Sequence, residues 1–371
     1  MAEQIPLETG PPTGTRTVTL IEHFPVRRAI QWALGAGLLV FVVVGAYRTL
    51  TLGTAQGGLS AAAWRDLVVF GVAQGAVIAL IALGYSLVYG ILLMINFAHG
   101  EVFMAGAFGS YFVAVTLDQN GFLDKNPIAS IAILLLVAMA VSTLIAVLLE
   151  RIAYRPLRNA PRLVPLITAI GASLFLQNTF REFFGAQVRG YPSINTLNGH
   201  WKILGIPILK TNAIVIITAL VAMVVLTLFV AKTKTGKSMR AVAQDKEIAA
   251  LMGINVDRVI VTTFAIGGIM AGVAGVLFAL VFGEVDAFMG FLPGIAAFTA
   301  AVLGGIGSIS GAALGGLILG LLQSVAPFLL LAGFHVPSPN QLKDVVSFSI
   351  LVLVLIFRPG GILGTGEAEK V

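Results

Sequence analysis

The sequence predicts an all-α, polytopic membrane protein with about ten transmembrane helices. Of its 371 residues, 58% are hydrophobic and only 11% are charged, whereas soluble domains average about 25% charged residues. Several continuous apolar runs are long enough to cross a lipid bilayer as helices. Such runs, rather than short alternating ones, exclude a transmembrane β-barrel. Cysteine is absent, which excludes disulfides, thiol catalysis and thiolate metal sites.

The candidate spans follow one another with short polar connections. Their ranges are 29–47, 67–89, 97–117, 128–149, 163–180, 213–231, 259–282, 290–305, 311–332 and 342–357. The run 290–305 is short, so it either spans the membrane or re-enters it. Residues 1–28 are polar and rich in proline, and we expect a disordered cytoplasmic tail there. Residues 29–64 then form an extra span with an outer loop, and 65–371 form the main transmembrane domain.

Basic residues set the predicted orientation. Ten spans put both termini on one side of the membrane, and most of the 23 lysines and arginines then fall on that side. We therefore expect both termini and the polar segment 232–258 to be cytoplasmic. The net charge of +6 reflects these span ends, which meet anionic lipid, rather than binding to nucleic acid.

The segment Lys232–Arg258 is a polar island between two long apolar runs. The spacing of its apolar residues predicts a short amphipathic helix over about 237–253, capped by Ser238 and ended by Gly253. Its Gly-Lys-Ser triplet resembles the end of a phosphate-binding loop, but Ala231 replaces the leading glycine and a membrane helix precedes it. We therefore expect no nucleotide site here, and the segment is either a docking helix or a solvated linker.

Polar residues also interrupt the apolar sequence at Ile95–Glu101. Glu101 is the only formally charged side chain between Asp66 and Asp118, and His99 is the only imidazole. A carboxylate at the centre of a bilayer costs roughly 2.5–3.5 kcal/mol, so it must face a cavity or a partner. Three interpretations stay open: Asn96 or Glu101 caps the next helix, the segment takes part in coupling or gating, or it contacts substrate.

Two further polar segments allow more than one interpretation. The run from Tyr154 to Arg158 is expected to turn and to anchor the topology, because Arg155 precedes a proline. Glu284 and Asp286 either line a vestibule that accepts a ligand's ammonium group or are solvated loop acids.

Glycines four residues apart, as at Gly71 and Gly75 or at Gly268 and Gly272, predict close packing between helices. The sequence shows no nucleophile–base pair and no metal-ligand spacing. We therefore expect neither a catalytic site nor a cofactor.

Several long motifs resemble LivH-type permeases of branched-chain amino acid ABC transporters. They occupy 75–85, 88–90, 94–101, 154–158, 169–171, 176–178, 251–255, 257–260, 298–308, 343–348 and 360–364. The resemblance is collinear over about residues 65–371. Members of that family begin near Leu67, so residues 1–64 are an extension, which puts the amino terminus inside where the family pattern puts it outside.

The resemblance implies the permease subunit of a bacterial inner-membrane importer, without an ATPase site of its own. The implied partners are a second homologous permease, two cytoplasmic ABC ATPases and a periplasmic amino-acid-binding protein. The segment 232–258 is similar to the cytoplasmic coupling loop of such permeases. The residues that would contact an ATPase are Arg240, Ala241, Asp245, Ala249, Ala250 and Gly253.

Two alternatives remain at this point. A permease of the same family could carry urea, short amides or other amino acids, and the sequence hardly separates these substrates. A single-chain secondary transporter would show intramembrane carboxylates or an inverted repeat of broken helices. The scarcity of charge in the central spans argues against the secondary transporter.

Overall fold

The computed structural model describes residues 26–51, 58–158, 160–161, 163–203, 205–358 and 360–364, so most of the predicted tail 1–28 lies outside the described residues. In chain order the elements are α1 (Val26–Thr51), α2 (Ala61–Leu92), α3 (His99–Gln119), α4 (Phe122–Lys125), α5 (Pro127–Leu149), η2 (Glu150–Tyr154), η3 (Arg155–Leu157), α6 (Leu163–Phe184), β1 (Arg189–Gly190), η4 (Asn195–Leu197), β2 (His200–Ile203), β3 (Ile206–Leu209), α7 (Lys210–Lys232), α8 (Lys234–Gln244), α9 (Lys246–Leu251), α10 (Val256–Phe282), β4 (Glu284–Val285), α11 (Phe291–Gly304), α12 (Ile309–Leu331), η5 (Ala332–Phe334), η6 (Pro339–Leu342) and α13 (Lys343–Phe357).

The predicted all-α membrane fold is confirmed. Within the described residues, eight helices are long and apolar enough to cross a membrane. Two further apolar helices, Gly35–Thr51 of α1 and α11, are shorter. α11 has 14 residues, so it extends only about 21 Å, against roughly 30 Å of hydrocarbon in a bilayer. The segment 290–305 therefore does not cross a membrane by its helix alone.

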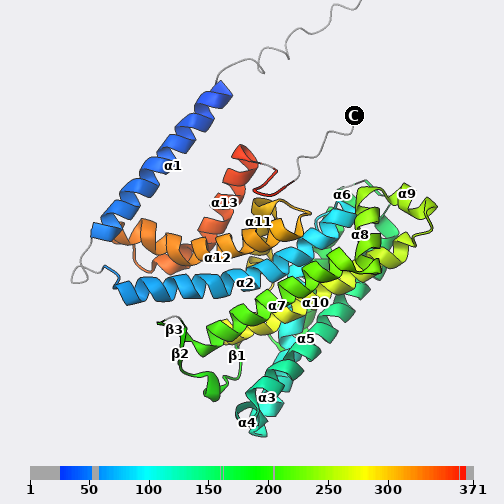
Figure 1. The fold of residues 1–371 in the computed structure, drawn as a ribbon, viewed down its shortest axis with the longest axis horizontal. Helices are drawn as coiled ribbons and strands as arrows, with labels where there is room; N and C mark the ends of the chain where they lie inside the picture. Colours follow the sequence, from blue (N-terminus) through cyan, green and yellow to red (C-terminus); the bar gives the residue numbers. More distant parts are fainter. Residues whose placement is uncertain are drawn as a thin grey trace, which may run out of the picture. The chain divides into compact units, whose positions relative to one another are not determined.

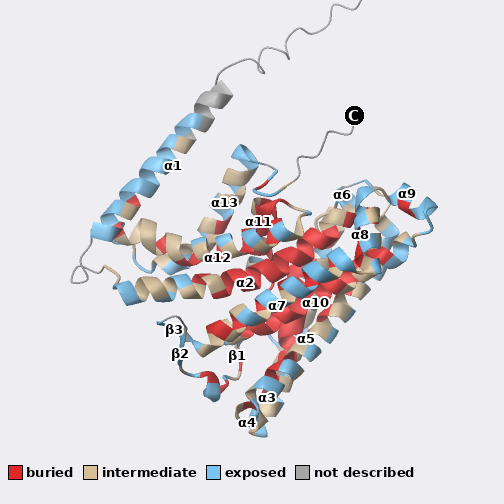
Figure 2. Ribbon diagram, viewed as in Figure 1, coloured by how far each residue is buried: buried red, intermediate tan, exposed pale blue. Residues whose placement is uncertain are grey.

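The described residues fall into two units that divide within α1, between Val44 and Gly45. The second unit is built around α2, α3 and α10, which carry the largest share of buried residues (Figure 2). α12 packs along α2, and α5 packs along α10 and α3 (Figure 1). The last turns of α1 belong to this unit, because Thr49 Oγ1 accepts a hydrogen bond of 2.8 Å from the Gly333 N–H.

Glycines let the central helices approach backbone to backbone. A Cβ atom added to Gly75 on α2 would lie 2.9 Å from the carbonyl oxygen of Leu317 on α12. One added to Gly268 on α10 would lie 2.8 Å from Thr143 Cα on α5. Both positions confirm that the small-residue spacing serves helix packing.

Polar connections gather at two ends of the second unit, which we call the α8–α9 end and the hairpin end. At the α8–α9 end, Arg155 donates a hydrogen bond of 3.0 Å to Asp257 on α10. The hairpin end holds the antiparallel β2–β3 hairpin and the β1–β4 pair, in which Arg189 faces Val285. α7 and α10 each run from one end to the other.

Candidate functional site

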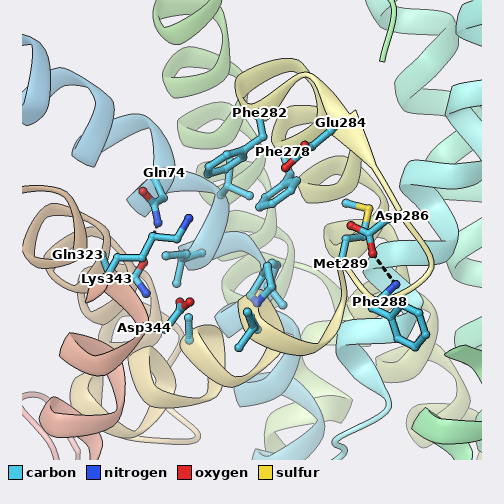
Figure 3. Close-up of a pocket in the computed structure, with 16 residues that line it drawn as sticks. Gln74, Phe278, Phe282, Glu284, Asp286, Phe288, Met289, Gln323, Lys343 and Asp344 are labelled. Carbon is cyan, nitrogen blue, oxygen red and sulfur yellow. Dashed lines mark hydrogen bonds between the residues drawn. The ribbon is translucent and has the colours of Figure 1, made fainter. Parts of the chain in front are cut away.

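A cavity of about 290 Å³, the hairpin-end cavity, lies among α2, α10, α11, α12 and α13 (Figure 3). Ligand pockets in proteins measure roughly 300–1,000 Å³, so this one suits a small ligand. Its wall is apolar where α2 and α11 contribute Val77, Ile81 and Ala296. Figure 3 shows Lys343 and Asp344 on one side of the cavity and Glu284 and Asp286 on the other.

One lysine and three acids therefore surround an apolar wall. Lys343 is the first residue of α13, and its Nζ lies 5.3 Å from the centroid of the Phe282 ring. Within the described residues, the ion pairs involve neither Lys343 nor the three acids of the cavity. These charges are thus available to a ligand that carries groups of both signs.

Local backbone chemistry brings the two acids after α10 to this cavity. Gly283 ends α10 with φ +70°, and its N–H donates to the Ala279 carbonyl. The chain then pairs with β1 over Glu284 and Val285. Asp286 Oδ1 accepts a hydrogen bond of 2.7 Å from the Phe288 N–H, which fixes the next turn. Glu284 and Asp286 line a cavity, as the vestibule interpretation expects.

Several polar residues of this cavity are missing from the sequence-based site. Gln74 Nε2 on α2 donates a hydrogen bond of 2.7 Å to Gln323 Oε1 on α12. Gln323 in turn donates to Ser347 Oγ on α13. The signal that could have found both glutamines is a polar side chain inside a long apolar run, because such a group must find a polar partner or a cavity.

A second cavity, of about 260 Å³, lies between α3, α6 and α11, and we call it the Glu101 cavity. Glu101 Oε1 accepts hydrogen bonds from Ser173 Oγ at 3.0 Å and from Gln177 Nε2 at 2.7 Å. Glu101 is 1% exposed, and its Oε2 has no hydrogen-bond partner among the described residues. The carboxylate is therefore held through one oxygen while the other is unpaired.

The capping interpretation of Asn96 and Glu101 is wrong. α3 begins at His99, and the residue at its N-cap is Ala98. In the described part of the chain, no side chain accepts a hydrogen bond from this N-terminus as a cap. The physical reason is that Ser173 and Gln177 supply donors for Glu101 from another helix, which turns the carboxylate away from its own first turn.

The three residues predicted as a path or gate lie close together in the chain but have different surroundings. Asn96 Oδ1 accepts a hydrogen bond of 2.6 Å from the Tyr154 hydroxyl, which joins the loop before α3 to η2. His99 is buried, and its ring lies 5.0 Å from that of Tyr85. Glu101 lines the cavity just described. Asn96 and His99 thus pack in the protein interior near Glu101, which faces a cavity.

At the α8–α9 end, the predicted single helix over 237–253 is two helices. α8 begins after Thr233, whose Oγ1 accepts a hydrogen bond of 3.0 Å from the Gly236 N–H. The predicted cap at Ser238 is therefore wrong, because the Thr233 hydroxyl caps the helix five residues earlier. Ser238 Oγ instead donates to the Lys234 carbonyl within α8.

Asp245 separates the two helices. Its backbone is extended, and its Oδ1 accepts hydrogen bonds from the N–H groups of Glu247 and Ile248. An aspartate that caps a new helix in this way competes with continuation of the old one. Gly253 has φ +83°, the left-handed conformation predicted for the residue that ends this segment.

The residues predicted to contact an ATPase do not share one face. Ala249 is buried, whereas Ala250 and Gly253 are exposed. Ala241 and Asp245 are half-buried. Arg240 Nη1 donates a hydrogen bond of 2.7 Å to the Val230 carbonyl. It thereby supplies a donor to a carbonyl in the last turn of α7, where carbonyl groups lack partners within the helix.

Large apolar side chains are exposed beside Ala250 and Gly253. They are Ile248, Leu251 and Met252, and Leu251 is 86% exposed. Together these five residues are called the α9 tip. Exposed apolar patches of this kind occur at sites that contact other proteins, membranes or ligands.

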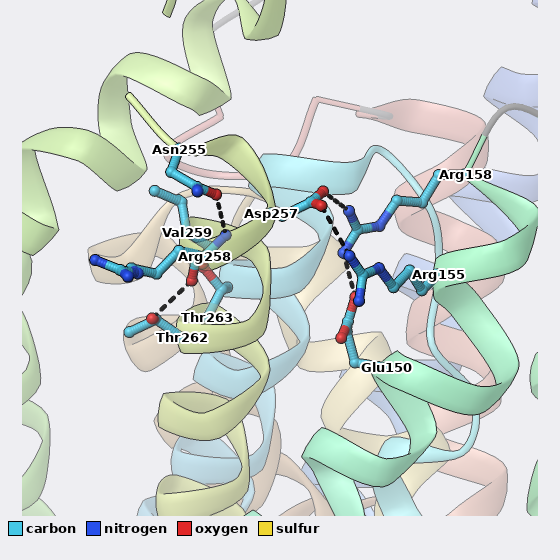
Figure 4. A network of polar contacts seen from close by, with 9 residues as sticks. All are labelled: Glu150, Arg155, Arg158, Asn255, Asp257, Arg258, Val259, Thr262 and Thr263. Atoms are coloured by element: carbon cyan, nitrogen blue, oxygen red, sulfur yellow. Dashed lines mark hydrogen bonds and ion pairs between the residues drawn. The ribbon is translucent and has the colours of Figure 1, made fainter. Parts of the chain in front are cut away.

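An ion network joins the connection after α5 to the first turn of α10, which follows the α9 tip in the chain (Figure 4). Arg158 pairs with Glu150 and with Asp257, and Arg155 pairs with Asp257 at 3.0 Å. The Glu150 side chain is fully buried, so Arg158 compensates a charge that water does not reach. Burial, and then repulsion by Arg158, lower the pKa of Lys246 at the start of α9. The run Tyr154–Arg158 therefore has a structural partner beyond its expected role as a topology anchor.

Within the described residues, no group of three or more His, Asp or Glu side chains is placed to hold a metal ion.

Known proteins resemble this chain over most of its length. A family model described as the branched-chain amino acid transport system / permease component matches residues 67–355. The chain is 44% identical over 306 residues to the high-affinity branched-chain amino acid transport system permease protein LivH of Escherichia coli (strain K12), which covers 81% of this chain and 96% of that one. It is 43% identical over 307 residues to the corresponding protein BraD of Pseudomonas aeruginosa, covering 82% and 97%. It is also 30% identical over 177 residues to the autoinducer 2 import system permease protein LsrD of Escherichia coli (strain SMS-3-5 / SECEC), covering 46% and 50%.

Proposed function

Because the chain belongs to the family of branched-chain amino acid transport permease components, we propose that it is the transmembrane permease subunit of an ABC importer for branched-chain and other hydrophobic amino acids. The family match over residues 67–355 includes the hairpin-end cavity, the Glu101 cavity and the α9 tip. Substrate moves inward, and partner subunits hydrolyse the ATP that drives it.

The proposed assembly lies in a bacterial inner membrane. It contains a second homologous permease, two cytoplasmic ABC ATPases and a periplasmic amino-acid-binding protein. The α9 tip faces an ATPase and the hairpin end faces the binding protein. The excess of basic residues toward the α8–α9 end supports this orientation, with both termini in the cytoplasm.

The α9 tip is the observation that carries the coupling part of this proposal. Its three apolar side chains are exposed at the end where arginines and lysines gather, away from the apolar spans. Burying a leucine or methionine side chain against a partner contributes roughly 1.5–3 kcal/mol. A groove on an ATPase that accepts Leu251 and Met252 therefore explains both their exposure and their position. Not all of the residues predicted to contact the ATPase then touch it. The ones that instead support the α9 tip from within this chain are Arg240, Ala241, Asp245 and Ala249.

α10 provides the mechanical link between the α9 tip and the hairpin-end cavity. Its 27 residues extend about 40 Å. Asp257, in its first turn, joins the ion network with Arg158, and Phe282, its last residue, lines the cavity. When ATP binding closes the ATPases, a shift of the α9 tip is carried along α10 to the cavity. The work comes from the different affinity of the two conformations for ATP.

The hairpin-end cavity suits a zwitterion with an apolar side chain. Lys343 can bind a carboxylate, and Asp344, Glu284 or Asp286 can bind an ammonium group through charge-assisted hydrogen bonds. The apolar wall accepts an aliphatic side chain. Urea and short amides carry neither charge, so they would leave these groups unused. The relative named for autoinducer 2 import makes substrate competition a necessary part of the test.

Co-purification from native membranes tests the proposed assembly. A tagged chain should bring down a second permease and an ABC ATPase. Identification by mass spectrometry should recover both in comparable amounts to the tagged chain. A chain that is purified intact, in mild detergent, without any ATPase contradicts the proposal.

A further inference from the structure

Glu101 presents a carboxylate oxygen that nothing in the described part of the chain satisfies. Oε1 accepts hydrogen bonds from Ser173 and Gln177, whereas Oε2 is buried and unpaired. Oε2 is also not part of any ion pair among the described residues. Burying a carboxylate without a counter-charge is costly, and such a group inside a membrane domain is retained for binding or transport.

Among the described residues, aromatic rings and no lysine or arginine line the Glu101 cavity. Tyr85, Phe97 and Phe291 line the same cavity, together with the aliphatic side chains of Ile170 and Leu174. The Asp286 carboxylate is close enough to act on the charge of Glu101. Carboxylates beside aromatic faces are the chemistry that binds an ammonium group, because both attract a cation.

α11 begins beside this carboxylate. Its N-cap is Gly290, which lines the cavity, and no side chain of the described residues caps the helix there. A Cβ atom added to Gly290 would lie 2.6 Å from Glu101 Oε2, so the glycine leaves that oxygen room. The N-terminus of a helix favours an anion.

An α-amino acid carries its ammonium and its carboxylate on the same carbon, so its site must hold an anionic group next to an electropositive one. Glu101 and the N-terminus of α11 meet this requirement. We propose that the Glu101 cavity is the site that holds the substrate in transit, with the α-ammonium on Glu101 and the α-carboxylate at the start of α11. This inference rests on the proposed function and names a substrate site within it.

α11 also separates this site from the hairpin-end cavity. Leu292, Pro293 and Ala296 line the hairpin-end cavity, whereas Phe291, Gly294 and Ile295 line the Glu101 cavity. A substrate therefore passes from the first to the second by displacement of α11. This helix is short and is bounded by Gly290 and by Gly305, which has φ +106°.

Equilibrium binding of radiolabelled leucine tests the site. The whole transporter is placed in nanodiscs without its binding protein, so that binding protein does not mask the affinity of the permease. Glu101→Gln keeps an acceptor for Ser173 and Gln177 but removes the charge, and should weaken leucine binding roughly ten- to hundredfold. Glu101→Asp should lie between this variant and the wild type. Glu182→Gln, which removes an exposed carboxylate on α6, is the matched control and should bind as the wild type does.

Two further measurements separate ligand contact from a merely structural role. Removal of the ammonium should matter, so 4-methylpentanoate should compete poorly with leucine for the wild type. Leucine should also slow modification of Glu101 by a hydrophobic carbodiimide in the wild-type protein, a readout that needs no variant to fold.

Wild-type affinity in Glu101→Gln together with no protection of Glu101 from the carbodiimide, or a wild-type transporter that binds no leucine without its binding protein, would overturn the Glu101 site. Neither result touches the proposed function, which is judged by ATP-driven uptake. A transporter that takes up no hydrophobic amino acid at all overturns both.

Discussion

Arg158, in the connection between α5 and α6, forms an ion pair with Asp257 on α10, 99 residues further along the chain. The same guanidinium pairs with the buried carboxylate of Glu150. One side chain thus ties the end of α5 to the start of α10, which follows the α9 tip in the chain. We therefore expect the position of that tip to depend on Arg158.

Arg158→Ala should destabilise the protein by about 3–5 kcal/mol, because it leaves Glu150 charged and buried without a partner. The matched control is Arg155→Ala. Arg155 pairs with Asp257 where both side chains are 56% exposed, and such pairs contribute roughly 0–1 kcal/mol. Thermal unfolding of the purified protein in detergent measures both effects. Equal midpoints for the two variants would count against a supporting role for Arg158.

Leu251→Glu should abolish substrate-stimulated ATP hydrolysis by the assembled transporter, because it puts a charge into the apolar contact between the α9 tip and the ATPase. Leu251 makes a sharper target than Arg240, whose guanidinium completes the end of α7 and whose loss would disturb the fold. Leu251→Met, which keeps an apolar side chain at the same exposed position, is the control and should retain coupled hydrolysis. Coupled hydrolysis at the wild-type rate in Leu251→Glu would exclude the α9 tip as the ATPase contact.

Lys343→Met should lower leucine uptake about tenfold at low substrate concentration, since it removes the cation that meets the substrate carboxylate in the hairpin-end cavity. Lys202→Met, on the β2 strand at the same end of the molecule, removes an equal charge away from the cavity. Initial uptake rates in proteoliposomes give the comparison. If both variants lose uptake equally, long-range attraction rather than contact explains the role of Lys343.

Gly268→Ala should destabilise the protein by roughly 1–3 kcal/mol, because its new methyl group would overlap the backbone of α5. Gly171→Ala makes the same change in α6, where nothing lies within 4 Å of the added carbon. Alanine is the better helix former by about 1 kcal/mol, so this control should be neutral or slightly stabilising. The midpoints of thermal unfolding decide the matter, and a neutral Gly268→Ala would contradict the packing assigned to α5 and α10.

Much of the fold can be predicted from the sequence because hydropathy alone specifies a membrane helix. The long runs that become α2, α5, α7 and α10 need no tertiary information. Asp245 breaks the expected single helix through two local hydrogen bonds. An aspartate in a polar segment does not by itself predict such a break. The shortness of α11 is visible in the sequence, but its place between two cavities is not.

The candidate site was harder to predict because its residues come from distant parts of the chain. Glu101 was identified as a lone charge in an apolar region, yet its donors, Ser173 and Gln177, lie on another helix. Lys343 lies near the acids after α10 only when α13 packs beside α11 and α12. Sequence spacing carries no information about such long-range contacts, since they depend on how the helices pack.

ATP-driven uptake of leucine into proteoliposomes tests the central claim most directly. The complete transporter is reconstituted with ATP on the side of the ATPases and with radiolabelled leucine and the binding protein on the other side. We predict saturable accumulation that requires ATP, that isoleucine and valine inhibit, and that urea and acetamide leave unchanged. Accumulation that continues without ATP under an ion gradient, or uptake of urea in place of leucine, would contradict it.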